Sequence, residues 1–231
     1  MTEKDTIRCE SVFNEDRTHR YLWKRVWNKD KPLAAVIMLN PCMADNLTMD
    51  TTTFLVVNNI ARLEEYGGVE IVNLYSLLTN KLNFRWNSDE DLNGPDNDTY
   101  IKKAALEAEA VILAWGKTQD TNQRVADRAT AVLKLLEGQK GKLRVITDGK
   151  RSGIHPLTPS VRTAWLLEPY KEQGPIGPAA RRATTEPEAV LSTKARKKSS
   201  AKKRGQPEAE QQPPCDAPNA SESASSETDA S

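Results

Sequence analysis

Four residues with chemical or conformational significance lie within or just after apolar runs of this chain. Asn40 follows LAAVIML, Asn73 interrupts VEIVNLY, Gly116 follows AVILAW, and His155 lies in the loop that follows LRVIT. An amide can orient water or match a donor–acceptor pair, and an imidazole can donate to an oxygen that gains negative charge. The pattern predicts a polar site formed by loops at the ends of buried strands.

The first of these loops, MLNPCMADNLTMD, allows two interpretations. Asn40, fixed by Pro41, could orient a water molecule without carrying charge, or it could simply cap a turn. Asp45 and Asp50 could act as general bases, or they could cap the helix that follows. The residues by themselves leave both interpretations open.

The other three loops carry the same kind of ambiguity. A buried Asn73 must satisfy both a donor and an acceptor, either with backbone groups or with the edge of a pyrimidine. Gly116 allows the backbone to approach a ligand closely, whereas Trp115 before it is predicted to belong to the core. Pro156 fixes the path of the loop that carries His155, which could be structural or could donate to a transition state.

The apolar runs alternate with amphipathic segments, as strands alternate with helices. Buried strands are predicted over 33–39, 69–75, 110–115 and 143–147, and a half-buried strand or hairpin over 12–27. Helices are predicted from Asp50–Thr53 to about Tyr66, with Gly67 and Gly68 as the stop, over 97–109, over 119–137, and over 161–167. This order predicts an α/β fold with a mainly parallel four-stranded central sheet, helices on both faces and an N-terminal hairpin. Sites in such sheets form at the carboxyl ends of strands.

Composition limits the classes of protein that are possible. The formal net charge is +1, so bulk charge indicates no partner. Three cysteines are too few for a disulfide framework, a four-thiolate zinc site or a cysteine-ligated iron–sulfur cluster. We therefore expect a site without metal or cofactor in the reducing cytoplasm. The polar start MTEKDTIRCE is unlike a signal peptide, and no apolar run approaches the ~20 residues that cross a bilayer, so no membrane partner is expected.

The chain divides into an α/β domain over residues 1–173 and a tail over 174–231. Apolar periodicity stops near Tyr170, and Pro, Ala, Ser, Lys and Glu dominate afterwards. Such a segment cannot offset the entropy lost on folding, so the tail is predicted to be disordered. Its basic block KARKKSSAKKRG could contact nucleic acid nonspecifically, or the tail could serve only solubility.

The motifs MLNPCMAD, VNLYSLLT, GPDND, AWGK and HPL resemble those of the DUF1643 family over about residues 20–170. Their order is also similar to that of the uracil-DNA glycosylase superfamily. There a water-activating loop, with Asn-Pro in the mismatch-specific branch, precedes a pyrimidine-reading Asn, a Trp-Gly or Leu-Gly turn and a His-Pro loop. The resemblance implies a monofunctional DNA glycosylase that flips its nucleotide out of DNA and needs no cofactor.

Residue roles follow from this resemblance. Asn40 would position water, with Asp45 as a possible aid, and His155 would donate to the departing base. The resemblance also implies a base site with Asn73 as the reader, formed by Pro41, Cys42, Asn73, Gly116 and Pro156. DNA-backbone contacts are expected from Lys117, Lys150 and Arg151, within a cationic rim that also includes Arg124 and Arg162.

The resemblance also bears on the substrate. Uracil-specific members carry Asp-Pro-Tyr in the first loop, and here the small Cys42 takes the place of the ring that excludes substituents at pyrimidine C5. The pocket should then admit a modified pyrimidine, including a bulky 5-substituted base of viral DNA, as in antiviral base excision. An amide is a weaker base than a carboxylate, so we expect a slower reaction or reliance on Asp45.

Two other classes of function stay open. The same cleft could belong to a hydrolase or transferase acting on free nucleotides or another small metabolite, in which case a cationic rim around His155 is not needed. The domain could also be a noncatalytic nucleic-acid-binding module that depends on its tail, and removal of the tail would then abolish its function.

Overall fold

The structure is a computed structural model, and it describes residues 2, 4, 6–43, 46–172 and 177–178. Asp45 and the predicted disordered tail, apart from Gly177 and Pro178, lie outside the described residues. No helix within the described ranges is long and apolar enough to cross a membrane.

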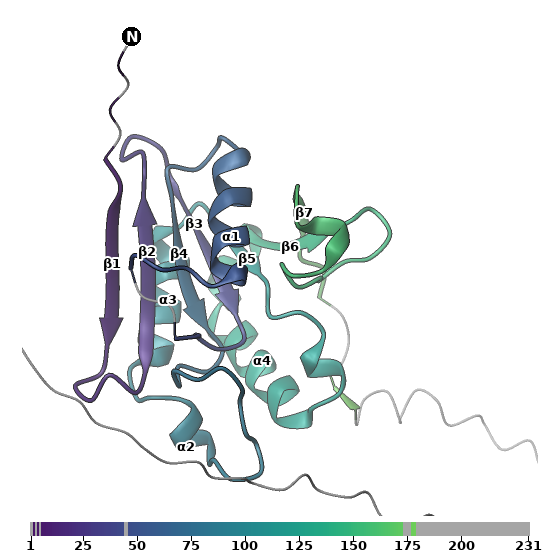
Figure 1. The fold of residues 1–231 in the computed structure, drawn as a ribbon. Helices are drawn as coiled ribbons and strands as arrows, with labels where there is room; N and C mark the ends of the chain where they lie inside the picture. Colours follow the sequence, from purple (N-terminus) through teal and green to yellow (C-terminus); the bar gives the residue numbers. More distant parts are fainter. Residues whose placement is uncertain (1, 3, 5, 44–45, 173–176, 179–231) are drawn as a thin grey trace, which may run out of the picture. The chain divides into compact units, whose positions relative to one another are not determined.

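The fold is α/β and centres on a single mixed sheet (Figure 1). Its strands are β1 (Arg8–Phe13), β2 (Arg20–Val26), β3 (Leu33–Met38), β4 (Gly68–Asn73), β5 (Ala110–Leu113), β6 (Leu143–Thr147) and β7 (Leu166–Pro169), in the order β1-β2-β4-β3-β5-β6-β7. Neighbours among β4, β3, β5 and β6 pair in parallel, whereas the outer pairs β1–β2, β2–β4 and β6–β7 are antiparallel.

The predicted four-stranded sheet is thus incomplete, because both of its edges are extended. The N-terminal hairpin joins the sheet through β2, which pairs with β4. At the other edge, the segment predicted as a helix over 161–167 forms only a short 3-10 turn, Pro159–Val161, and then β7. The helix prediction was wrong because Leu166–Pro169 satisfies its backbone by pairing with β6.

Helices cover both faces of the sheet. They are α1 (Thr51–Arg62), α2 (Asp89–Leu92), α3 (Asn97–Glu107) and α4 (Gln123–Leu135), with 3-10 turns at Thr118–Asp120 and Glu137–Lys142. Val56 and Ile60 of α1 belong to the core cluster on one face, which also contains Val36 and Ile71. α3 and α4 pack on the other face against Ile37, Val72 and Leu113, and Figure 1 shows α1 in front of the sheet and α3 behind it.

Two helix boundaries differ from the predictions for local reasons. α1 ends at Arg62 rather than near Tyr66, since Glu64 adopts a left-handed conformation (φ 57°) before Gly67 is reached. α4 begins at Gln123 rather than Gln119, because the Asn122 side chain accepts from the backbone N–H of Val125 and caps the helix there.

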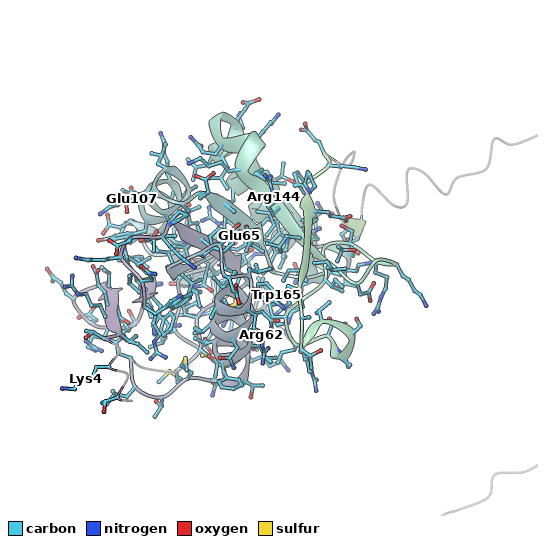
Figure 2. The ribbon with its side chains drawn as sticks, turned by 90° about the horizontal axis from the view of Figure 1, so that it is seen from above. Lys4, Arg62, Glu65, Glu107, Arg144 and Trp165 are labelled. Atoms are coloured by element: carbon cyan, nitrogen blue, oxygen red, sulfur yellow. The ribbon has the colours of Figure 1, made fainter. Side chains whose placement is uncertain are left out.

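The end of α1 also fixes the approach to β7. Arg62 donates to the carbonyl oxygen of Thr163 at 3.0 Å, and Asn59 donates to that of Arg162 at 3.1 Å. Figure 2 shows Arg62 and Trp165 close together in the view from above, and Trp165 belongs to the core cluster on the α1 face. These contacts hold the segment after His155 against the same helix that begins at the candidate site.

Candidate functional site

The loops after β3 and β4 run side by side at the carboxyl edge of the parallel strands. Backbone bonds join Leu74 N to Met38 O at 2.8 Å and Thr79 N to Pro41 O at 3.3 Å. The Nδ2 group of Asn40 donates to the Thr79 carbonyl at 2.7 Å and to that of Pro41 at 3.1 Å. The amide nitrogen therefore fastens the two loops together, and the amide oxygen is the atom that can accept a hydrogen bond from water.

Asn73 is the last residue of β4 and is 1% exposed. It pairs with Met38, and the alternation along β4 puts it on the α1 face with Ile71. Its side-chain Oδ1 has no hydrogen-bond partner among the described residues. Because an unsatisfied buried acceptor costs about 1–3 kcal/mol, this oxygen is well suited to accept from a bound ligand or water.

A carboxylate, a thiol and a guanidinium meet beside this strand end. Asp50 caps α1, with Oδ1 accepting from the N–H groups of Thr52 and Thr53. Its Oδ2 accepts from the Thr53 hydroxyl and from the Cys42 thiol, with Sγ at 2.7 Å. Arg20 is hydrogen-bonded to Cys42 and interacts electrostatically with Asp50. The group binds the first loop to the start of α1.

The charge states of this group follow from its surroundings. Burial alone would raise the pKa of Asp50, but hydrogen bonds from Cys42 and Thr53, and from the Thr52 backbone, outweigh it and lower the pKa. Burial lowers the pKa of Arg20, and the neighbouring Cys42 and Asp50 oppose that shift. Asp50 is therefore a half-buried anion stabilised by hydrogen-bond donors, which makes it a better electrostatic anchor than a general base.

Arg20 reaches this group because of an irregularity in the hairpin. β1 and β2 pair Val12 with Leu22 and then Phe13 with Arg20, so Tyr21 is an additional residue on β2. Leu22 packs in the α3-side core and Tyr21 stacks on Tyr100 of α3, with ring centroids 5.4 Å apart. The extra residue lets Arg20 point to the opposite face, toward the start of α1.

His155 supplies a neutral donor. Burial lowers its pKa, and the charge of Asp50 opposes the shift. The backbone N–H of Leu157 donates to Nδ1 at 3.1 Å, so in the neutral ring the proton is assigned to Nε2. Gly116 lies against this ring with φ 73°, and a Cβ there would come within 3.0 Å of the His155 Cβ. The absence of a side chain at Gly116 therefore leaves room for the His155 ring. Pro156, next to His155, is buried.

The predicted DNA-backbone cations differ from one another in their contacts. Lys117, directly after Gly116, and Lys150 are exposed. Arg151 is engaged with Asp148, whose pKa hydrogen bonds from Ser160 and Arg151 hold well below its usual range. Of the wider rim, Arg124 is bonded to the 84–89 segment and Arg162 to the Leu157 carbonyl. Asp45 lies outside the described residues.

The sequence reasoning missed Arg20 and did not assign a partner to Asp50. Both had a signal: Arg20 is a charged residue at the start of a largely apolar strand, and Asp50 precedes three threonines. Neither signal reveals that the two side chains meet. Within the described part of the chain, no group of three or more His, Cys, Asp or Glu side chains could hold a metal ion.

These features define an α/β domain with a polar site at the carboxyl edge of its parallel strands. The chain belongs to the DUF1643 family, a family described as protein of unknown function, which matches residues 20–157, more than half of the 231 residues. Every residue of the group just described, from Arg20 to His155, lies within the matched range. No curated protein and no solved structure matches the chain.

Proposed function

We propose that this domain is a monofunctional DNA glycosylase that removes a modified or mismatched pyrimidine and leaves an abasic site. The observation that carries the proposal is the amide of Asn73, buried at the strand end with an oxygen that lacks a partner among the described residues. A pyrimidine edge offers both a donor and an acceptor to such an amide.

The proposed chemistry uses groups whose charge states suit it. Breaking an N-glycosidic bond moves negative charge onto the departing base while the sugar becomes oxocarbenium-like. The Nε2–H of neutral His155 would donate to the base oxygen that gains this charge. The oxygen of Asn40 would orient the attacking water, and the Asp50 anion would favour the cationic sugar electrostatically.

The substrate preference rests on Cys42. Its thiol is small and half-buried, and it is turned toward Asp50 and Arg20 by hydrogen bonds. A substituent at pyrimidine C5 would therefore meet a thiol instead of an aromatic ring. We propose that the pocket accepts 5-substituted pyrimidines, including the bulky modified bases found in viral DNA.

The direct test is excision. Duplexes carrying uracil, a thymine mismatch or 5-substituted cytosines are incubated with the protein and then treated with alkali, which breaks the strand at abasic sites. We expect strand breaks with at least one substituted base, and loss of breaks in Asn73→Ala and His155→Ala. His19→Gln, which alters the other histidine of the chain, is the matched control. Absence of abasic sites on every duplex would refute the proposal.

The contact of Cys42 with Arg20 favours one alternative, a thiol-dependent hydrolase acting on a free nucleotide or another small metabolite. A guanidinium beside a cysteine stabilises the nucleophilic thiolate, whereas the Asp50 carboxylate that accepts from the thiol opposes its deprotonation. Cys42→Ala separates the two candidates. The glycosylase should retain most of its turnover, whereas a thiol-dependent hydrolase should lose all covalent chemistry.

A further inference from the structure

An exposed tryptophan protrudes from the segment that follows β4. Trp86 is 75% exposed, whereas Trp23, Trp115 and Trp165 are at most 5% exposed and Trp27 is half-buried. In Figure 1 the chain between β4 and α2 extends beyond the carboxyl ends of β3 and β4, the edge that bears the candidate site. A large aromatic side chain left in water at this edge is available to a partner.

The tip that carries Trp86 is held rigidly from both sides. Arg124 of α4 donates through Nη1 to the Phe84 carbonyl at 2.6 Å and to the Asn87 carbonyl at 3.0 Å. Its Nε donates to Asp89 at 3.0 Å, and its guanidinium lies 5.5 Å from the Phe84 ring centroid. One half-buried arginine thus holds the chain before and after the Arg85–Trp86 pair, and Trp86 is exposed on a segment fixed by these contacts.

The charge around Trp86 suits an anionic partner. The Arg85 guanidinium lies 5.0 Å from the Trp86 ring centroid. Among the residues that the structure describes, neither Arg85 nor the exposed Lys81 takes part in an ion pair. Of the acids that follow, Asp89 pairs with Arg124 and Asp91 accepts from the Ser88 backbone in the capping box of α2. Glu90 is exposed and takes part in no ion pair among the described residues.

The same segment is anchored at the candidate site. It starts at Asn73, and the Asn40 amide holds its Thr79 carbonyl at 2.7 Å. Asn40 therefore connects the site with the base of the segment, and Arg124 fixes its tip. The candidate site and the exposed Trp86 therefore belong to one connected segment at this edge of the sheet.

We propose that Arg85 and Trp86 form a stacking tip that binds an unpaired nucleotide of a DNA strand. The indole ring stacks on a base, and Arg85 with Lys81 contacts the adjacent phosphates, an arrangement typical of single-strand binding. The inference deepens the proposed glycosylase and rests on it for the choice of DNA. It predicts a preference for a single strand or a locally opened duplex over a fully paired duplex.

Fluorescence gives a direct readout because the other tryptophans are buried or half-buried. The full-length protein is titrated with a 15-nucleotide oligothymidine in about 0.2 M salt, which weakens contacts made by charge alone. We expect bound oligonucleotide to protect Trp86 from acrylamide quenching. Trp86→Ala should weaken binding roughly 5- to 150-fold, the range for loss of one stacked base, and Trp86→Phe should recover most of it.

Leu106→Ala, which removes a 54% exposed apolar side chain from α3, is the control and should bind like the wild type. Arg85→Gln should reduce the slope of log affinity against log salt by about 0.7, as expected for one single-strand phosphate contact. Trp86 that stays equally quenchable at saturation, or tighter binding of a fully paired duplex, would overturn the inference. If bound oligonucleotide protects Trp86 from quenching but no abasic sites form, only the glycosylase proposal is refuted. If abasic sites form but Trp86 is not protected, only the stacking tip is refuted.

Discussion

Two polar clusters lie at the carboxyl edge of the sheet, one on each face, and they use their hydrogen bonds differently. On the α3–α4 face, Arg128 donates through Nε to the Leu74 carbonyl at 2.7 Å, and Asn97 donates to the carbonyls of Asn73 and Leu74. On the α1 face, Cys42 is hydrogen-bonded to both Arg20 and Asp50, and Arg20 interacts electrostatically with Asp50. The hydrogen bonds of the first cluster hold backbone carbonyl groups in place, whereas those of the second cluster connect side chains to one another.

An unpartnered oxygen by itself does not distinguish the two clusters. Among the described residues, the Oδ1 atoms of both Asn73 and Asn97 lack a partner. The amide nitrogen of Asn97 donates to backbone carbonyls at the end of β4 and the start of the following loop. The side chain of Asn73 instead lies on the same face of the sheet as the start of α1, where Cys42 is hydrogen-bonded to Asp50. The comparison teaches that the α3–α4 cluster is structural and that the α1-side cluster is the one suited to a ligand.

The largest expected effect is a loss of activity when a side chain of the candidate site is removed. His155→Ala should reduce the turnover of the proposed glycosylase about 10²- to 10³-fold, because it removes one preorganised donor to developing charge. Its thermal midpoint should stay near that of the wild type, since the ring is only half-buried. Single-turnover kinetics and thermal melts measure the two quantities. Equal loss of activity in His19→Gln would contradict the assignment.

Arg128→Met tests the opposite cluster. It should lower the free energy of unfolding by about 1.5–3 kcal/mol, because the Leu74 carbonyl loses its charge-assisted donor and keeps only the neutral Asn97 amide. Activity per folded molecule should change little. Chemical denaturation gives the stability, and active-site-normalised rates give the activity. A variant that is stable but inactive would reverse the roles given to the two faces.

Gly116→Ala should affect both stability and the site. A left-handed conformation costs a residue with a Cβ about 1–2 kcal/mol, and the new Cβ would press on His155. We expect Gly116→Ala to lower the free energy of unfolding. We also expect its turnover per folded molecule to fall, because the displaced His155 would no longer be positioned correctly. Gly149→Ala is the control, since its φ of 80° imposes the same backbone strain but no atom lies within 4 Å of its Cβ position. Equal turnover in the two variants would argue against contact with His155.

The pH dependence sharpens the role given to His155. Its folded pKa is lower than the unfolded value of 6.5, so the neutral donor persists as pH falls through 6.5 and is lost only near the lowered pKa. Stability from the neutral ring is likewise present above 6.5 and lost at lower pH. Asp50→Asn removes a charge that raises this pKa and should move the acid limb of the rate profile to lower pH. An acid limb at or above 6.5 in the wild type would oppose the neutral-donor role.

The smallest effect concerns the exposed cations. Arg151→Ala should leave the salt dependence of DNA binding almost unchanged, because Asp148 already neutralises the guanidinium. Lys117→Ala should reduce the slope by about 0.9, one phosphate contact on duplex DNA. Filter binding over a salt series measures both slopes. A larger loss in Arg151→Ala would mean that DNA displaces Asp148 from it.

Much of the fold could be predicted from local pattern. Continuous apolar runs identified β3, β4, β5 and β6, because strands covered by helices on both faces have no polar side. The helix start at Asp50 was predictable, since the residue before a helix bonds to N–H groups only two or three positions away. The end of α1 before Glu64 and the start of α4 after Asn122 were not predicted.

The sequence by itself determined the alternation of strands and helices and the order in which Asn40, Asn73, Gly116 and His155 follow strand ends. Only the tertiary structure decided which side chains meet. One additional residue, Tyr21, turns Arg20 toward Asp50, and a single arginine of α4 determines how Trp86 is presented. The physical reason is that strand register and long-range loop contacts depend on packing between distant segments, and a shift of one residue reverses the face that a side chain occupies.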